Sequence, residues 1–213
     1  EGNVTITLCY ATGNVTANTI GYGENVGGLV GRTHIANTTT TVQKCYVTGS
    51  VIGNKNVGGI HGYQQEDKGY ECHPRINTKN SYTTSSVTGN ENVGGIIGYT
   101  RRVSTASYGN WLNTIENCYA IGKIEGTTNV GGLVGLDGDT LATPNSYWSP
   151  ETTLQMSSAS GLGERRSITY MGTKEAYNTW DFGDNEDDED IWGIWMEWID
   201  RDRKSGSAGM PRP

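Results

Sequence analysis

The stretch Asn56-Val57-Gly58-Gly59-Ile60-His61-Gly62 decides the fold, because nearly the same seven residues occur three more times. A unit that returns at a regular interval predicts a repeat architecture, in which each unit stacks on the next. Paired glycines allow positive φ angles or close backbone approach, so we expect tight corners in each copy. The predicted corner residues are Gly27, Gly28, Gly31, Gly58, Gly59, Gly62, Gly94, Gly95, Gly98, Gly131, Gly132 and Gly135.

A second phrase, centred on a tyrosine, precedes each glycine phrase. Its copies start at intervals of 36, 36, 37 and 28 residues, at Cys9, Cys45, Ser81, Cys118 and Ser146. Side chains alternate within it: Cys45 and Val47 would face one way and Tyr46 and Thr48 the other, which is the period of a strand. The sequence therefore predicts an all-β fold, a parallel β-helix or β-solenoid of four to five coils over residues 1–148.

Equivalent residues of stacked coils should form ladders. A third strand is expected around 40–43 and 114–116, and the variable segments Tyr63–Asn80 and Tyr99–Asn113 are expected to leave the stack as loops. Asn25, Asn56, Asn92 and Asn129 are predicted to form an amide ladder, in which each side chain bonds to the next coil. The predicted inward ladders are Val15, Val51, Val87 and Ile124; Val26, Val57, Val93 and Val130; and Leu29, Ile60, Ile96 and Leu133.

The repeat stops after Trp148, and residues 149–213 are predicted to be a Trp-rich C-terminal cap with an acidic loop. A helical segment is expected near 168–177, opened by Ser167 or Thr169. Trp180, Trp192, Trp195 and Trp198 supply bulky apolar groups that would cover the unpaired edge of the last coil.

Composition narrows the function classes. The chain has 213 residues, of which 31 are Gly and 34% are hydrophobic, so a thin core suits it better than a thick one. Its net charge is -7, and residues 181–213 hold 10 acidic and 4 basic side chains. Without a clustered basic face, nucleic acid is not expected as a partner.

No run of 18 apolar residues occurs, so no membrane span is expected. The chain begins within a repeat, and we expect it to be a piece of a longer protein.

The four copies of Gly-hydrophobic-hydrophobic-Gly, each downstream of a Cys-Tyr or Ser-Tyr phrase, resemble the GLUG-motif repeat family. The matching segments are Gly28-Leu29-Val30-Gly31, Gly59-Ile60-His61-Gly62, Gly95-Ile96-Ile97-Gly98 and Gly132-Leu133-Val134-Gly135. The resemblance implies a β-helix-like solenoid within large secreted or surface-attached microbial proteins, including adhesins and non-catalytic parts of IgA-protease-type metallopeptidases. It implies no catalytic motif. His61 departs from the pattern, so its rung is either open or brings His61 to a polar partner.

Two sets of residues are candidate ligand sites. Tyr10, Tyr46, Tyr82, Tyr119 and Tyr147 recur on the face opposite the cysteines, where they would form either an aromatic strip for sugars or a protein surface, or a row packed beneath loops. The acidic run 184–190 offers oxygen ligands for calcium at Asp184, Glu186, Asp188 and Asp190, although a solvated acidic loop explains it as well. No other cofactor is expected.

The remaining reactive residues favour plain structural interpretations. Cys9, Cys45 and Cys118 share one ladder position with Ser81 and Ser146, which indicates buried thiols with no required disulfide. Cys72-His73 lacks the further ligands that zinc needs. The carboxylates of Asp137 and Asp139 could hold a cation or cleave polysaccharide, but no basic partner stands at a recognisable spacing.

These features predict a non-enzymatic module, secreted or exposed at the cell surface, that acts as an adhesive or spacer segment of a larger surface protein. Its expected partners are a glycan or a protein surface ligand. One alternative is a structural subunit that self-associates into an extracellular filament or surface layer. Another is a polysaccharide-degrading β-helix enzyme.

Overall fold

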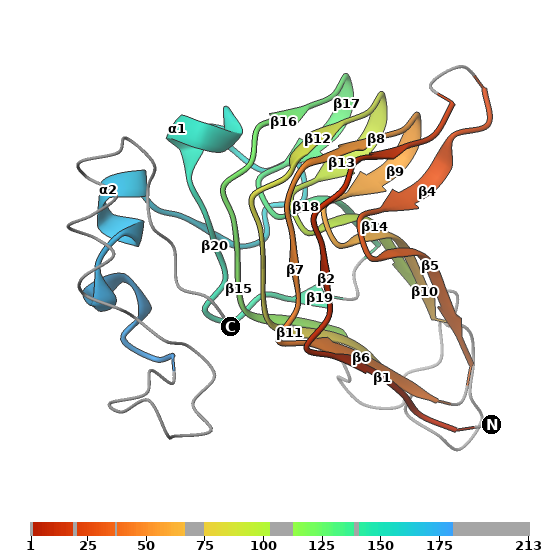
Figure 1. Ribbon diagram of the computed structural model, residues 1–213, viewed down its shortest axis with the longest axis horizontal. Helices are drawn as coiled ribbons and strands as arrows, with labels where there is room; N and C mark the ends of the chain where they lie inside the picture. The colour runs from red at the N-terminus through yellow and green to blue at the C-terminus, as the bar shows by residue number, and fades with distance from the viewer. Residues whose placement is uncertain are drawn as a thin grey trace.

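The computed structural model describes residues 2–18, 21–36, 38–66, 75–102, 113–138 and 141–180. Within them the chain is nearly all β and winds into a parallel β-solenoid of about three turns, which confirms the predicted fold class. Strands of successive repeats lie one behind another (Figure 1), and every strand pair within the described residues is parallel. Because each strand pairs with its equivalents in neighbouring coils, the backbone groups are satisfied between coils.

Four sheets make up the walls of the coil, and three of them hold four strands, one from each repeat. Sheet B contains β3 (Val15–Thr16), β8 (Ser50–Ile52), β12 (Ser86–Thr88) and β16 (Ile124–Glu125). Sheet C contains β4 (Glu24–Gly27), β9 (Lys55–Gly58), β13 (Glu91–Gly94) and β17 (Thr128–Gly131). Sheet D contains β5 (Val30–Ile35), β10 (His61–Glu66), β14 (Ile97–Arg102) and β18 (Val134–Gly138).

Sheet A has nine strands and also contains the start of the fifth repeat. Its members are β1 (Val4–Thr7), β2 (Tyr10–Ala11), β6 (Thr39–Gln43), β7 (Tyr46–Val47), β11 (Arg75–Thr83), β15 (Asn113–Ala120), β19 (Leu141–Ala142), β20 (Tyr147–Trp148) and β21 (Glu164–Arg165).

The expected long loops were partly wrong. β10 continues to Glu66 and β11 starts at Arg75, while β14 continues to Arg102 and β15 starts at Asn113. The extra strand residues are held in register: Gln64 pairs with Thr33 and Thr100, and Asn77 pairs with Thr41 and Thr114. Pairing with the neighbouring coils therefore extends the sheets into segments whose sequences differ from repeat to repeat.

The predicted apolar ladders line the interior. Val51, Val57, Val87, Val93 and Ile96 are fully buried, whereas their equivalents in the first coil, such as Val15 and Leu29, are partly exposed. All belong to one continuous core cluster. Side chains of the first coil have a neighbouring coil on one side, which explains their greater exposure.

Asparagine, and not glycine, takes the left-handed conformation at the second residue of each sheet C strand, where the chain turns. Asn25, Asn56, Asn92 and Asn129 have φ between 53° and 58°. Their side chains form the predicted ladder: Nδ2 of Asn56 donates to Oδ1 of Asn25 at 2.8 Å, and Asn92 and Asn129 continue it at 2.7 and 2.8 Å. Asparagine tolerates this region better than other side chains, so one residue both turns the chain and joins the coils.

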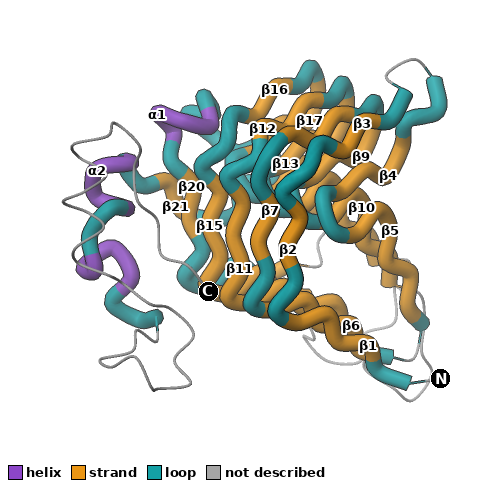
Figure 2. The backbone as a smooth tube through the Cα atoms, viewed as in Figure 1, coloured by secondary structure: helices purple, strands orange, loops and turns teal. Residues whose placement is uncertain are grey.

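The paired glycines are required for close approach. None of the corner pairs is among the described glycines with positive φ. A Cβ on Gly28 would lie 2.5 Å from Cγ1 of Val47, and one on Gly95 would lie 2.5 Å from Cβ of Ala120. Figure 2 shows the result: sheets B and C form a narrow upper lobe, and sheets A and D a broader lower one. We call the contact between the second glycine and sheet A the waist.

Residues 149–180 cover the last coil and part of its side. They include α1 (Pro150–Thr153), α2 (Ile168–Met171) and the 3-10 helix η1 (Lys174–Tyr177). Ser167 caps α2 as predicted, by accepting a hydrogen bond from the Tyr170 backbone, but the expected helix is broken into two short ones. Gln155 and Ala159 bond to carbonyls of the fourth coil, at Ile124 and Val130. Trp192, Trp195 and Trp198 lie outside the described residues.

The waist makes a direct prediction about stability. We expect Gly95→Ala to lower the free energy of unfolding by about 1–3 kcal/mol, because the new methyl group would overlap Ala120 and the backbone of Gly132. Urea unfolding followed by circular dichroism measures the change. Gly13→Ala is the matched control, since a Cβ at Gly13 meets nothing within 4 Å. Equal stability of the two variants would contradict a tight waist.

Candidate functional site

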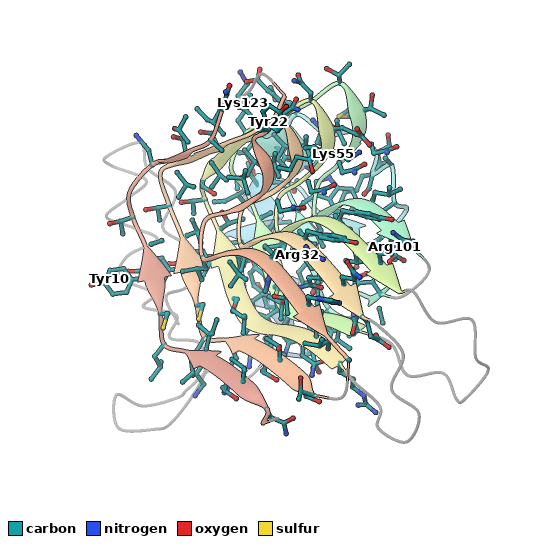
Figure 3. All side chains as sticks on the ribbon, turned by 90° about the vertical axis from the view of Figure 1, so that its right-hand side faces the viewer. Tyr10, Tyr22, Arg32, Lys55, Arg101 and Lys123 are labelled. Atoms are coloured by element: carbon teal, nitrogen blue, oxygen red, sulfur yellow. The ribbon has the colours of Figure 1, made fainter. Side chains whose placement is uncertain are left out.

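The outer side of sheet D carries an unusual set of polar and aromatic residues. We call its outward side chains Arg32, His34, Tyr63, Gln65, Tyr99 and Arg101 the sheet D face. Figure 3 shows Arg32 and Arg101 on this side of the molecule. Arg32, His34 and Arg101 are exposed, whereas their strand neighbours Thr33 and Thr100 are buried. The alternation of a strand therefore presents these three side chains to solvent. Gln65 and Tyr99 are half-buried, and Tyr63 is 9% exposed.

The side chains of the sheet D face contact one another across three coils. The rings of Tyr63 and Tyr99 are stacked with centroids 5.2 Å apart. The guanidinium of Arg32 lies 5.5 Å from the Tyr63 ring and donates to Oε1 of Gln65 at 2.9 Å, and the Tyr63 hydroxyl donates to the same oxygen at 3.1 Å. Burial raises the pKa of Tyr63, while Arg101, which hydrogen-bonds it, acts in the opposite direction. The face is thus an ordered array.

The predicted aromatic strip forms a stacked row but is mostly covered. Successive ring centroids from Tyr10 to Tyr119 are 4.9–5.2 Å apart, as expected for adjacent coils. Tyr10 is exposed and Tyr46 is half-buried, but Tyr82, Tyr119 and Tyr147 are buried. For these three residues the expectation of an exposed platform was wrong.

The C-terminal segment explains why the row is covered. Met171, Tyr177 and Trp180 pack against Tyr82, Tyr119 and Tyr147 in one apolar cluster. The guanidinium of Arg166 lies 3.5 Å from the centroid of the Tyr147 ring. Burial raises the pKa values of Tyr119 and Tyr147. These tyrosines therefore dock the cap onto the solenoid, and the part of the row that remains open is Tyr10 and Tyr46.

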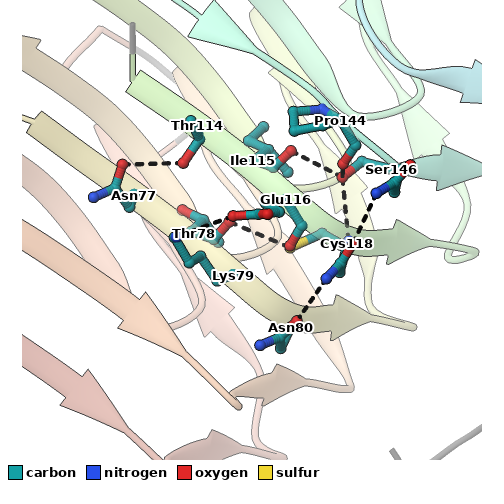
Figure 4. A network of polar contacts seen from close by, with 12 residues as sticks. Asn77, Thr78, Lys79, Asn80, Thr114, Ile115, Glu116, Cys118, Pro144 and Ser146 are labelled. Carbon is teal, nitrogen blue, oxygen red and sulfur yellow. Dashed lines mark hydrogen bonds and ion pairs between the residues drawn. The ribbon is translucent and has the colours of Figure 1, made fainter. Parts of the chain in front are cut away.

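The cysteine position is structural in the second and fourth coils. Cys45 and Cys118 are fully buried free thiols, whereas Cys9 is exposed. Burial raises the pKa of Cys118 to about 12. Figure 4 shows the position in detail: Sγ of Cys118 donates to the carbonyl of Glu116 at 3.2 Å, and Oγ of Ser146 donates to that of Pro144 at 3.1 Å. Cysteine and serine interchange because either can satisfy the carbonyl two residues earlier.

A second asparagine ladder precedes this position and was not predicted. Asn80, Asn117 and Asn145 have φ between 47° and 51°, and Asn117 and Asn145 each donate to the asparagine of the preceding coil. The recurring triplets Asn80-Ser81-Tyr82, Asn117-Cys118-Tyr119 and Asn145-Ser146-Tyr147 contained the signal. It was weakened because Leu8 and Lys44 occupy the same position in the first two coils.

His61 reaches a polar partner inside the closed coil, so its rung is not open. It is fully buried, and its Nε2 lies 3.1 Å from Oγ1 of Thr78, which is also fully buried. Within the described residues, Nδ1 of His61 and both amide atoms of Gln64 have no hydrogen-bond partner. Burial lowers the pKa of His61 to about 4, because desolvation disfavours the charged imidazole.

The other candidate ligands are not brought together in the described residues. Oδ1 of Asp137 accepts a hydrogen bond from Thr100 at 2.6 Å, and Asp139 lies outside the described residues. The calcium candidates Asp184, Glu186, Asp188 and Asp190, and Cys72-His73, also lie outside them. In the part of the chain that the structure describes, no three His, Cys, Asp or Glu side chains gather as metal ligands. No described helix is long and apolar enough to cross a membrane.

The fold and this face define the protein as a β-solenoid with an ordered polar and aromatic array on sheet D. Searches of family models, curated proteins and solved structures gave no match. The resemblance to the GLUG-motif repeats therefore rests on the repeated motifs themselves.

The buried imidazole makes stability depend on pH. The pKa of His61 is about 4 in the folded chain, compared with 6.5 for a solvated histidine, which is the value expected in the unfolded chain. The unfolded chain therefore binds the proton first as the pH falls. The contribution of His61 is complete above pH 6.5 and is lost down to about pH 4, with a slope of at most about 1.4 kcal/mol per pH unit. Urea unfolding between pH 4 and 7 measures this slope.

Carboxylates also titrate in that window, so the slope is compared with that of the double variant His61→Val with Thr78→Val. Both changes introduce residues of the kind that other coils have at the same positions. Ile97 and Val134 are equivalent to His61, and Val42 and Ile115 are equivalent to Thr78. The double variant should have a smaller slope than the natural chain. Identical slopes would mean that His61 is not held neutral.

Proposed function

We propose that this chain is a non-enzymatic β-solenoid module, secreted or displayed at a cell surface, that acts as an adhesive segment of a larger protein. The observation that carries the proposal is the sheet D face, on which hydrogen-bonding and aromatic side chains of three coils are fixed to a rigid sheet. Preorganised groups bind with a smaller entropy loss than groups on mobile loops. Tyr99 also provides aromatic contact area, which is enriched in binding surfaces, and it stacks on the buried Tyr63.

The position of the face supports this function. The strands below it are hydrogen-bonded on both sides in the second and third coils, since β10 pairs with β5 and β14, and β14 pairs with β10 and β18. Their inward side chains, including Ile97 and Thr100, are fully buried. Substitution of the outward side chains would leave this support in place, so the surface can be adapted to a ligand independently of the fold.

A glycan array probed with the labelled chain tests the adhesive function. Tyr99→Ala should weaken binding about 5- to 30-fold, because loss of an aromatic contact at a binding surface costs about 1–2 kcal/mol. Tyr10→Ala is the matched control, since Tyr10 is an exposed tyrosine of the other row. Circular dichroism establishes that both variants fold. Loss of binding with Tyr10→Ala alone would assign the ligand to the tyrosine row, and absence of binding to any glycan would refute the adhesive function.

A second candidate function, self-association, is favoured by the first coil. In the described residues, β1, β2, β3, β4 and β5 each pair on one side, and Val4, Leu8 and Tyr10 are 51%, 70% and 65% exposed. The opposite end is covered by residues 149–165. Unpaired strand edges with apolar side chains promote pairing with another chain.

Sedimentation across a range of protein concentrations tests this pairing. We expect a monomer–dimer equilibrium that Leu8→Lys shifts toward monomer, because a charge on a strand edge opposes pairing. The variant suits the fold, since Lys44 occupies the equivalent corner with nearly the same φ. Leu154→Lys is the control: Leu154 is also exposed and has φ 62°, but it lies in the cap. A monomer at all concentrations would contradict this candidate function.

A further inference from the structure

The sheet D face carries two exposed arginines, one from the first coil and one from the third. Its exposed ionisable groups are Arg32, His34 and Arg101, and its other described outward residues are uncharged or tyrosines. Within the described residues, neither arginine is part of an ion pair. The chain as a whole has a net charge of -7, so this local excess is opposite in sign to the rest of the molecule.

Carboxylates lie close by on sheets C and D: Asp137 of β18 accepts a hydrogen bond from Thr100, and Glu66 at the end of β10 is buried. Glu91 forms an ion pair with Lys55 at 3.0 Å in the adjoining ladder, and Glu24 also acts on Lys55. Lys55 is in turn close enough to Tyr99 for the two groups to interact electrostatically. The border of the sheet D face is therefore balanced in charge, while its centre remains cationic.

The two arginines converge on the second coil from opposite sides. Arg32 of the first coil donates to Gln65, and Arg101 of the third coil hydrogen-bonds Tyr63. A guanidinium carries five N–H donors in a planar fork, so most of its donors are available after one such contact. The two forks flank the Tyr63 hydroxyl and the Gln65 amide, which gives one small area that can bind an anionic group and hydrogen-bond its hydroxylated neighbours.

This arrangement selects among anions. A planar guanidinium matches a carboxylate with two parallel hydrogen bonds. Nucleic acids need many neutralised phosphates along a basic stripe, and two guanidinium groups on an acidic chain do not supply them. An extended polysaccharide fits better. Each of its sugar rings advances by about the spacing between neighbouring coils, which is about 4.8 Å in a sheet, and its hydroxyls suit Gln65 and the tyrosines.

We propose that the sheet D face binds a uronate-containing polysaccharide laid along the solenoid axis, with its carboxylates held by the guanidinium groups of Arg32 and Arg101. This inference rests on the proposed adhesive function and specifies the ligand of the same surface. Gln65 and Tyr99, which are half-buried, contact the sugar rings and hydroxyls between the carboxylates, and Tyr63 packs against both Tyr99 and Arg32. Binding weakens as salt is added, because the charges that meet are exposed.

Titration calorimetry with polygalacturonate and its fully methyl-esterified form tests the carboxylate directly, because the two polymers share a backbone and differ in charge. We expect binding of the acid form and at least about tenfold weaker binding of the ester. Arg32→Gln and Arg101→Gln should each weaken binding of the acid form by about tenfold. Lys123→Gln removes one exposed cation, paired with Glu125 away from this face, and should leave binding unchanged.

Each other outcome is decisive. Equal binding of acid and ester, or binding that neither arginine variant changes, would overturn the inference while leaving adhesion intact. Binding of dextran sulfate without binding of polygalacturonate would assign the arginines to sulfate esters and would also overturn it. If a glycan array is negative throughout and neither polymer binds, the adhesive function itself fails.

Discussion

The asparagine ladder is the interaction on which the rest of the solenoid depends. Asn56 and Asn92 lie at the corner in a left-handed conformation and each bonds to the asparagine of the coil before it. A glycine could adopt the same φ, but it would add flexibility and would provide no bond between coils. Because asparagine makes the turn, the adjacent glycine pair is available for a different task, which is to let sheets C and D approach sheet A.

That approach determines which residues can stand opposite the glycines. Val47, Thr83 and Ala120 occupy the waist in successive coils, and Trp148 occupies it in the fifth. The indole of Trp148 lies against Gly132 and donates to the backbone of Gln155 in the cap. A side chain of this size at the waist leaves no room for another coil of the same kind. The position that sustains the stack therefore also ends it, and the segment after Trp148 closes the exposed end.

The sequence was sufficient for the parts of the fold that repeat. Period-two alternation located the inward ladders, and the recurrence of Asn56 and its equivalents was enough to predict their amide ladder. It was not sufficient where the repeats differ. Residues 63–66 share only their tyrosine with 99–102, so the extension of sheet D, which arises from pairing with the neighbouring coils, had almost no local signal. The cover over Tyr119 depends on where Trp180 docks, which is a tertiary contact that no local pattern encodes.

The same reasoning indicates where this molecule can vary. Inward and waist positions are restricted by volume, and even a polar exception such as His61 is accommodated only because Thr78 provides a partner in the opposite sheet. Outward positions of sheet D meet neither restriction, since Arg32, Tyr63 and Tyr99 occupy one ladder with different side chains. Differences between coils at such positions are not needed for folding. Their concentration on one face, in contact with one another, is what makes that face the best candidate for recognition.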